Sequence, residues 1–228
     1  MTDGNQAPEP KLRAAFYIDG FNFYHALDAL GQQHMKWLSY WKLCNIVLPQ
    51  RTQELVGVTW CTARHPSDNS KAIRHDALVR AQLCEGVLVR KGHFVSEDRD
   101  CRDCGNQWKH PSEKEGDINV AIHLLRDGFR DVYDHAYLLT ADSDQVATIR
   151  MFKAEFPQKK LTVVVPPGRQ RSKHLHDASP NGTIQLNDGH VDRAIMRQTV
   201  MKAGVGSVRR PFEYDPPEGW VHPDDRPK

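Results

Sequence analysis

Four aspartates in this sequence stand where apolar segments end or helices begin. Asp142 and Asp144 directly follow the apolar stretch YLLTA, Asp19 ends the stretch AAFYID, and Asp117 opens the stretch GDINVAIHLLRDG. Carboxylates brought together repel one another, and a cation relieves that repulsion. Mg²⁺ or Mn²⁺ suits an all-oxygen site. Such ions can activate water and stabilise the departing oxygen of a phosphodiester.

Helix capping is the alternative role for these acids. Asp117 could cap the helix that it begins, and Asp142 or Ser143 could cap the next one. A cap needs only one acid, so it leaves the second acid of the pair Asp142 and Asp144 without a role. Asp19 ends an apolar strand and precedes a glycine, which makes a cap a weaker account there unless a helix starts at once. We therefore treat the four acids as one predicted site.

The elements around these acids alternate between apolar strands and helices. Such alternation predicts an α/β fold, namely a PIN-like or Rossmann-like three-layer α/β/α sandwich with a mostly parallel central sheet. In sheets of this kind, ligands bind beyond the carboxyl ends of the strands, where the strand order reverses. The expected strands cover residues 14–19, 55–63, 87–95, 135–141, 161–167 and 182–186, and the expected helices cover 20–31, 39–49, 67–86, 116–128, 142–157 and 191–204.

The helix over 116–128 has apolar residues at the spacing of one helical face. Ile118, Ala121, Ile122 and Leu125 follow the i, i+3, i+4, i+7 pattern, which predicts an amphipathic helix here. Around the domain over 13–204 we expect a disordered leader at 1–12, a polar loop at 96–115 and a proline-rich tail at 205–228 that is flexible or lies on the surface.

Composition places the chain among ordinary globular proteins. It has 228 residues, 26% of them charged, and a net charge of +2, which neither announces nor excludes a nucleic-acid partner. The apolar runs are too short to cross a bilayer, and the polar N-terminus lacks the pattern of a secretory signal. We expect a cytoplasmic protein with no membrane partner.

Two further clusters could bind ligands. Cys101 and Cys104 form a C-x₂-C pair followed by glycine, a pattern found in zinc sites, and His93 and His110 could complete a Cys₂His₂ site. The alternative is a reduced surface loop. The stretch GRQRSKHLH carries basic residues just after an expected strand, and they could contact an RNA backbone: Arg169, Arg171 and Lys173.

Three motifs together resemble one family. FYIDGFNFYHAL, EKEGDINVAIHLL and YLLTADSDQVATIRMF resemble, in this order, the three motifs of the NYN domains, a branch of the PIN-like ribonuclease superfamily that includes LabA-like proteins. The resemblance spans about residues 14–166. It implies a PIN-like sandwich and metal-dependent RNA cleavage, with the metal held by Asp19, Asp117, Asp142 and Asp144.

The resemblance also assigns supporting roles. Asn22 falls where the family has an asparagine beside the first acid, so it would position substrate or water. Thr140 and Ser143 are the hydroxyl residues of the third motif and would donate or accept hydrogen bonds that hold the metal-binding acids in place. Gln145 departs from the family pattern, in which an aromatic residue is common, and this change puts the pocket shape in doubt. PIN-like domains often pair, which adds a homodimer by analogy.

The resulting hypothesis is a metal-dependent endoribonuclease, a hydrolase that attacks RNA phosphodiesters with metal-bound water. One alternative is a catalytically weak or inactive scaffold of the same fold that binds RNA or a protein partner. A second is a haloacid-dehalogenase-like phosphatase with Asp142 as nucleophile and Asp144 as acid and base. The phosphatase leaves Asp19 and Asp117 unexplained, and no later paired-acid motif follows.

Overall fold

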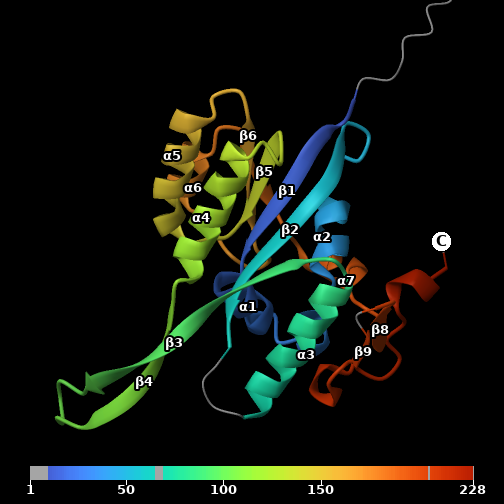
Figure 1. Ribbon diagram of the computed structural model, residues 1–228. Coiled ribbons are helices and arrows are strands. Elements are labelled where there is room, and N and C mark those ends of the chain that lie inside the picture. The colour runs from blue at the N-terminus through green and yellow to red at the C-terminus, as the bar shows by residue number, and fades with distance from the viewer. Residues whose placement is uncertain (1–9, 65–68, 205, 228) are drawn as a thin grey trace, which may run out of the picture.

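The computed structural model describes residues 10–64, 69–204 and 206–227, and Figure 1 shows their arrangement. The strands are β1 Leu12–Asp19, β2 Gln53–Ala63, β3 Leu88–Asp100, β4 Gln107–Lys114, β5 His135–Leu139, β6 Lys160–Val165, β7 Thr183–Gln185, β8 Thr199–Lys202 and β9 Gly206–Arg209. The α-helices are α1 Gly20–Ala29, α2 Tyr40–Val47, α3 Ser70–Cys84, α4 Gly116–Phe129, α5 Val146–Glu155, α6 Lys173–Ala178 and α7 Asp188–Arg193. Single 3₁₀ turns are η1 Gln33–Lys36, η2 Ser143–Gln145, η3 Phe212–Tyr214 and η4 Pro223–Asp225.

The central sheet has the strand order β4-β3-β2-β1-β5-β6-β7 in the described part of the chain. Every neighbouring pair is parallel except β3 and β4. The chain builds outward from β1 in one direction through β2 and β3, and then crosses back to place β5 on the other side. The strand order therefore reverses between β1 and β5, and a ligand site is expected at the carboxyl ends of these two strands.

Helices cover both faces of the sheet (Figure 1). Alternate residues of β1 serve the two layers: Phe16 and Ile18 belong to the core under α1, α2, α3 and α7, whereas Ala15 and Tyr17 belong to the core under α4, α5 and α6. This confirms the predicted three-layer α/β/α sandwich with a mostly parallel sheet. Apolar residues on both faces of a strand are the reason that it reads as a continuous apolar run in the sequence.

A tight strand-to-helix junction follows β1. A Cβ atom added at Gly20 would lie 2.2 Å from Nε1 of Trp60 and 2.3 Å from the Cys61 carbonyl oxygen. Only glycine lets the chain pass this close to β2. Asp19 caps α1, because its side chain accepts a hydrogen bond from the backbone N–H of Asn22 at 3.0 Å. The helix thus begins directly after the strand, and Asp19 stays at the edge of the sheet.

The predicted polar loop over 96–115 is instead a long hairpin. Strands β3 and β4 pair antiparallel from His93 opposite Lys114 to Asp100 opposite Gln107. Beyond Gly92 the strand β3 pairs, among the residues that the structure describes, with β4 alone, so the hairpin leaves the sheet as an arm. A two-stranded ribbon that is exposed on both faces is rich in polar residues. A loop has the same composition, which is why the sequence predicted one here.

The helix predicted over 116–128 is confirmed as α4, but its two isoleucines face away from the core. Ile118 and Ile122 are 60% and 53% exposed, whereas Val120 and Leu124 are fully buried against the sheet. The helix carries apolar residues on two faces, so periodicity alone could not choose between them. Gly128 helps to decide, because a Cβ atom there would lie 2.8 Å from the ring of Phe156. The glycine side of the helix packs inward, and the isoleucine side faces out.

The C-terminal region also departs from the prediction. A helix over 191–204 is wrong, because α7 ends at Arg193 and β8 pairs antiparallel with β9. Val200 and Val208 of this hairpin are buried with the core beside α3. The tail packs as well: Tyr214 is buried, and Glu213 accepts a 2.9 Å hydrogen bond from Arg74.

At the other end of the chain, the leader predicted over 1–12 falls mostly on residues 1–9, outside the described residues, and Leu12 already begins β1. Within the described ranges, no helix is both long enough and apolar enough to traverse a bilayer.

Candidate functional site

Asp19 lies at the centre of the candidate site, at the carboxyl end of β1. It is 3% exposed, and its second carboxylate oxygen accepts a 2.9 Å hydrogen bond from the hydroxyl of Thr140. Burial, together with the negative charges of Asp117 and Asp142, raises the pKa of Asp19 to about 6, although the hydrogen bonds from Asn22 and Thr140 act against this rise. The raised pKa reflects a carboxyl group that is largely shielded from solvent and lies near other negative charges.

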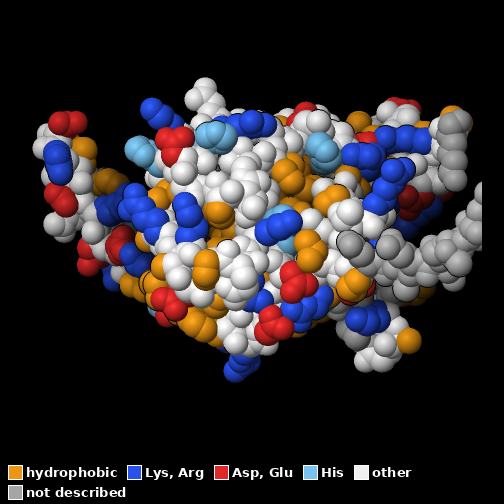
Figure 2. All heavy atoms as spheres, turned by 90° about the horizontal axis from the view of Figure 1, so that it is seen from above, with side chains coloured by type: hydrophobic (Ala, Val, Ile, Leu, Met, Phe, Trp, Pro, Cys, Tyr) orange, Lys and Arg blue, Asp and Glu red, His pale blue; other side chains and the backbone are white. Residues whose placement is uncertain are grey.

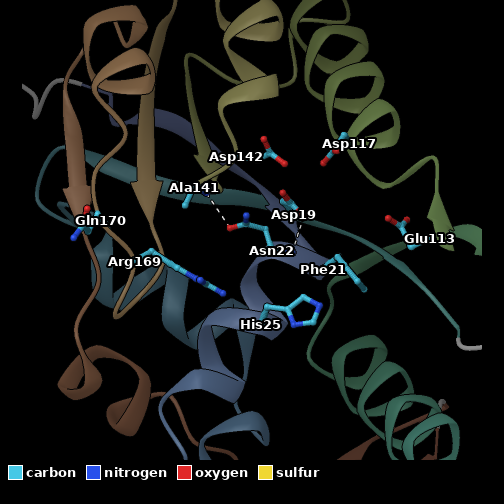
Figure 3. A pocket seen from close by; sticks show the side chains of 10 residues that line it. All are labelled: Asp19, Phe21, Asn22, His25, Glu113, Asp117, Ala141, Asp142, Arg169 and Gln170. Carbon is cyan, nitrogen blue, oxygen red and sulfur yellow. Dashed lines mark hydrogen bonds between the residues drawn. The ribbon is translucent and has the colours of Figure 1, made fainter. Parts of the chain in front are cut away.

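Thr140 and Asn22 join the ends of β1 and β5. The Thr140 hydroxyl donates to Asp19 and accepts a 3.0 Å hydrogen bond from the backbone N–H of Asp142. The Asn22 side-chain oxygen accepts a 2.9 Å hydrogen bond from the backbone N–H of Ala141 (Figure 3). These bonds cross the topological switch point and fix the position of Asp142 relative to Asp19. Thr140 thus makes hydrogen bonds around the site, whereas the side chain of Asn22 holds the backbone of Ala141, and its expected contact with substrate or water stays a prediction.

Asp142 and Asp144 have different surroundings. Asp142 lines the pocket at the sheet edge and also caps η2, because it accepts a 3.0 Å hydrogen bond from the backbone N–H of Asp144. Asp144 is exposed and does not line the pocket, and Ser143 beside it is exposed too. Of the two acids that follow β5, the structure places only Asp142 in the pocket.

Asp117 reaches the pocket from the first turn of α4. Partial burial and the charges of Asp142 and Asp144 raise its pKa. Gln145 secures its position: the Gln145 side chain is buried and donates a 3.1 Å hydrogen bond to the backbone carbonyl of Asp117. The amide at position 145 therefore ties the start of α4 to η2, a polar contact that an aromatic ring at this position could not make.

Glu113 is a pocket residue that the sequence analysis missed. It lies near the end of β4 and lines the pocket, and its Oε1 atom is buried without a hydrogen-bond partner among the described residues. Burial, followed by the charge of Asp117, raises its pKa. Gly116 makes room for it, because a Cβ atom there would lie 2.6 Å from Oε1. The signal was present in EKEGD, where Glu113 precedes that glycine by three residues.

Figure 3 shows the whole pocket, a cavity of about 390 Å³. Its acids stand together, and Arg169 and His25 approach from the opposite side. The lining residues are Asp19, Phe21, Asn22, His25, Glu113, Asp117, Ala141, Asp142, Arg169 and Gln170.

Of the predicted basic residues, as of the acids, only some line the pocket. Arg169, in the segment after β6, lines the pocket, whereas Arg171 and Lys173 are exposed beyond it. The pocket is therefore bipolar, with three aspartates and one glutamate facing one guanidinium. Such an arrangement can bind a cation and an anion side by side.

The donor atoms suit a hard cation, but they are not packed around one point. Among the described residues, no three His, Cys, Asp or Glu side chains lie close enough to hold one metal ion. Mg²⁺ commonly keeps several waters and uses one or two protein carboxylates plus ligand phosphates. The pocket fits that looser kind of site, with the buried and unpartnered oxygen of Glu113 as a further acceptor nearby.

The predicted Cys₂His₂ zinc site is not assembled. His93 lies eight residues before Cys101 on an extended strand, roughly 26 Å away, and its ring contacts Glu115 at 3.3 Å. His110 pairs with Glu97, four residues before Cys101, or roughly 13 Å along the strand. Neither imidazole can reach an ion held by the two thiols.

The chain is similar to a curated protein in sequence and to a solved structure in fold. No family model matches the chain. Over 197 aligned residues the chain is 29% identical to 6-hydroxy-3-succinoylpyridine 3-monooxygenase HspA of Pseudomonas putida. The alignment covers 71% of this chain and 62% of the relative. The chain thus spans less than two thirds of that protein's length.

The curated relative contradicts one prediction. Its name describes a monooxygenase, an oxidoreductase, whereas the sequence analysis assigned the chain to the hydrolases as a metal-dependent ribonuclease. We therefore withdraw the assignment to the hydrolases. The acidic motifs that suggested it are compatible with more than one chemistry, because they report where charge gathers rather than which bond is broken.

The similar fold belongs to a protein of unknown function from Vibrio parahaemolyticus RIMD 2210633. Its crystal structure superimposes with a TM-score of 0.54 at 18% identity, and the match covers 80% of this chain and 98% of that one. This likeness concerns the fold alone, and it agrees with the three-layer sandwich described above.

Proposed function

We propose that this chain binds Mg²⁺ or Mn²⁺ in the acidic pocket and, through that ion and Arg169, a phosphate group of an RNA strand. The observation that carries the proposal is the gathering of Asp19, Asp117 and Asp142 around one cavity at the switch point of a parallel sheet. The resemblance to NYN domains supports RNA as the ligand. The proposal concerns binding and names no reaction.

The electrostatics of the pocket favour a cation. The pKa of Asp19 is raised to about 6, and the pKa values of Asp117 and Glu113 are raised as well, mainly by burial and then by neighbouring negative charges. A divalent ion among these groups would supply the opposite charge and favour their ionised forms. Metal binding at mildly acidic pH should therefore displace protons from the carboxyl groups of the pocket, because their pKa values are raised.

A phosphate group fits the other side of the pocket. Arg169 faces the acids across the cavity, and a guanidinium binds phosphate oxygens in a bidentate manner. The exposed Arg171 and Lys173 continue from it along the segment that leads into α6. A metal ion on one side and a basic segment on the other could hold successive phosphates of one strand.

Two rings at the rim could contact a base. Phe21 is 48% exposed, and its ring centroid lies 4.4 Å from that of His25 in an edge-on arrangement. Both residues line the pocket. An exposed phenylalanine beside a phosphate site offers the stacking platform that single-stranded nucleic acids use, at roughly 1–3 kcal/mol per base.

Metal binding is tested first, by calorimetric titration of Mn²⁺ and Mg²⁺ into the wild type and Asp142→Asn. Asp188→Asn is the control, because Asp188 is likewise an acid at the start of a helix but is exposed and belongs to α7, outside the pocket. We expect binding that Asp142→Asn weakens at least tenfold and that the control leaves unchanged. Equal affinity in all three proteins would place the ion elsewhere.

RNA binding is tested by fluorescence anisotropy with a labelled single strand, in EDTA and in Mn²⁺. We expect tighter binding with metal, and a loss in Arg169→Ala that exceeds the loss in Arg193→Ala, an exposed arginine on α7. Affinity that is the same with and without metal, and equal in the two arginine variants, would refute the proposal.

The curated relative supports a second candidate, an oxidoreductase that acts on a hydroxylated pyridine carrying a carboxylate side chain. The relative is named for 6-hydroxy-3-succinoylpyridine. In the present pocket Arg169 could pair with such a carboxylate, and Phe21 could contact the ring.

Quenching of the intrinsic fluorescence by 6-hydroxy-3-succinoylpyridine separates the two candidates. Saturable binding that Arg169→Ala abolishes, with no affinity for RNA, would favour the oxidoreductase. RNA binding without any response to the pyridine would favour the cation and phosphate site.

A further inference from the structure

The arm formed by β3 and β4 leads away from the rest of the fold (Figure 1), and it projects at the left of the view from above in Figure 2. Only the first part of β3, up to Gly92, is paired with β2. From His93 onward the arm is a two-stranded ribbon. A ribbon of two strands is only marginally stable alone in water, so an arm of this length is expected to gain from a partner at its end.

The turn at the tip of the arm brings two thiols to the surface. Its backbone is closed by two 2.8 Å hydrogen bonds, one from the Cys101 N–H to the Asn106 carbonyl and one from the Gly105 N–H to the Cys101 carbonyl. Gly105 has φ = 67°, the left-handed region that favours glycine. Cys101 is half-buried and Cys104 is exposed, whereas Cys44, Cys61 and Cys84 are buried. The C-x₂-C-G sequence therefore forms a built turn with both sulfurs at the end of the arm.

The chemistry of the tip favours a thiophilic cation. Residues 97–104 contain four acidic and two basic residues, so the tip attracts cations. Zinc binds thiolates, and structural zinc sites are four-coordinate. The tip supplies two ligands, and no third His, Cys, Asp or Glu joins them in the described ranges.

We propose that Cys101 and Cys104 form half of a tetrahedral zinc site, which the same turn of a second copy of this chain completes. A twofold axis through the ion would place identical turns face to face, which is the usual geometry of a homodimer. The missing pair of thiolates is then supplied by the same sequence. Because the arm leaves the sheet before it reaches its tip, the two tips can meet without contact between the acidic pockets.

The two exposed neighbours of the thiols fit this arrangement. Arg102 and Asp103 stand between the cysteines and carry opposite charges. In a face-to-face pair each arginine can approach the aspartate of the other copy, so the contact is self-complementary. The site differs from the acidic pocket in both ligand type and place, and it does not depend on the proposed function.

The test is zinc titration of the full chain under reducing conditions, in excess Mg²⁺ so that the carboxylates are occupied. Mass is followed by light scattering after size exclusion, and Co²⁺ replaces zinc in a parallel titration. We expect half an ion per chain, a zinc-dependent dimer, and cobalt spectra of a tetrahedral four-thiolate site.

Variants assign the ligands. Cys101→Ser and Cys104→Ser should each abolish both zinc binding and dimerisation, and thermal denaturation checks that the variants remain folded. Lys109→Ala, exposed on β4 of the same arm, and Asp188→Asn, exposed on α7, should retain the half ion per chain. One ion per monomeric chain, zinc bound equally by the serine variants, or a tip that takes up no zinc would each overturn the proposal.

Discussion

The buried carboxyl of Asp19 should oppose folding at neutral pH, and replacing it with an amide should therefore stabilise the protein. The pKa of Asp19 is raised from the ordinary 3.8 to about 6, by burial first and then by the charges of Asp117 and Asp142. Between these two pH values the folded chain binds a proton that the unfolded chain does not. Stability contributed by this group is therefore fully present below about pH 4 and is lost as the pH rises through about 6.

The size of the effect follows from the same shift. A pKa that rises by about two units disfavours the ionised form by roughly 3 kcal/mol. The amide of Asp19→Asn can keep both hydrogen bonds, since its oxygen accepts from the N–H of Asn22 and its NH₂ group can donate to the hydroxyl oxygen of Thr140. We expect the variant to exceed the wild type by roughly 1–3 kcal/mol in free energy of unfolding above pH 7, and to match it near pH 4.

Urea unfolding followed by tryptophan fluorescence, in EDTA and across this pH range, measures the difference. Asp134→Asn is a control for which the change in the free energy of unfolding should have the opposite sign. Hydrogen bonds from Arg13 lower the pKa of Asp134 to about 2, so its contribution is present above about pH 4 and is lost as the pH falls. That variant should be less stable than the wild type at neutral pH.

Metal should reverse the result for Asp19. If a divalent cation occupies the pocket, saturating Mn²⁺ should stabilise the wild type and leave Asp19→Asn almost unaffected, because a ligand that binds only the folded state stabilises it. A variant that is less stable than the wild type at pH 7.5 in EDTA would refute the reasoning, since it would mean that the carboxylate makes stabilising contacts that outweigh its burial.

Four further substitutions test how the fold positions the site. Gly20→Ala should destabilise the protein by about 1–3 kcal/mol in urea unfolding, because the added Cβ has no space beside β2. Leu124→Ala should cost about 2–5 kcal/mol whereas Ile122→Ser should stay within about 0.5 kcal/mol, and equal losses would contradict the inward face that the structure assigns to α4. Thr140→Val should cost about 1–3 kcal/mol, because it leaves the N–H of Asp142 and one oxygen of Asp19 without a partner, and it should also weaken Mn²⁺ binding in calorimetry.

The central sheet was predictable because its inner strands β1, β5 and β6 are buried on both faces. Runs such as AAFYID and LTVVV leave a parallel sheet as the natural arrangement. The segments that were mispredicted are those in which local pattern is ambiguous. The arm was predicted as a loop because its strands are rich in polar residues, which a loop would also contain. The buried face of α4 was not readable from the sequence, because the helix has apolar residues on two faces and only one of them meets the sheet.

The candidate site was predictable in part. Asp19, Asp117 and Asp142 meet at one pocket because parallel strands and the helix after the arm all present the same edge of the sheet. Asp144 could not be separated from Asp142 by sequence, since the difference arises from η2, which turns the chain after Asp142. Glu113 and its unpartnered oxygen became evident only once Gly116 was seen to leave space for that side chain.

The sequence by itself determined the alternation of strands and helices, the acids at their junctions and the thiol pair with its glycine, because these depend on the chemistry of neighbouring residues. Tertiary structure alone decided which acids share a cavity, which face of α4 is buried and where the histidines lie relative to the thiols. Those outcomes depend on contacts between segments far apart in the chain. Local propensity carries no information about such contacts until the sheet brings the segments together.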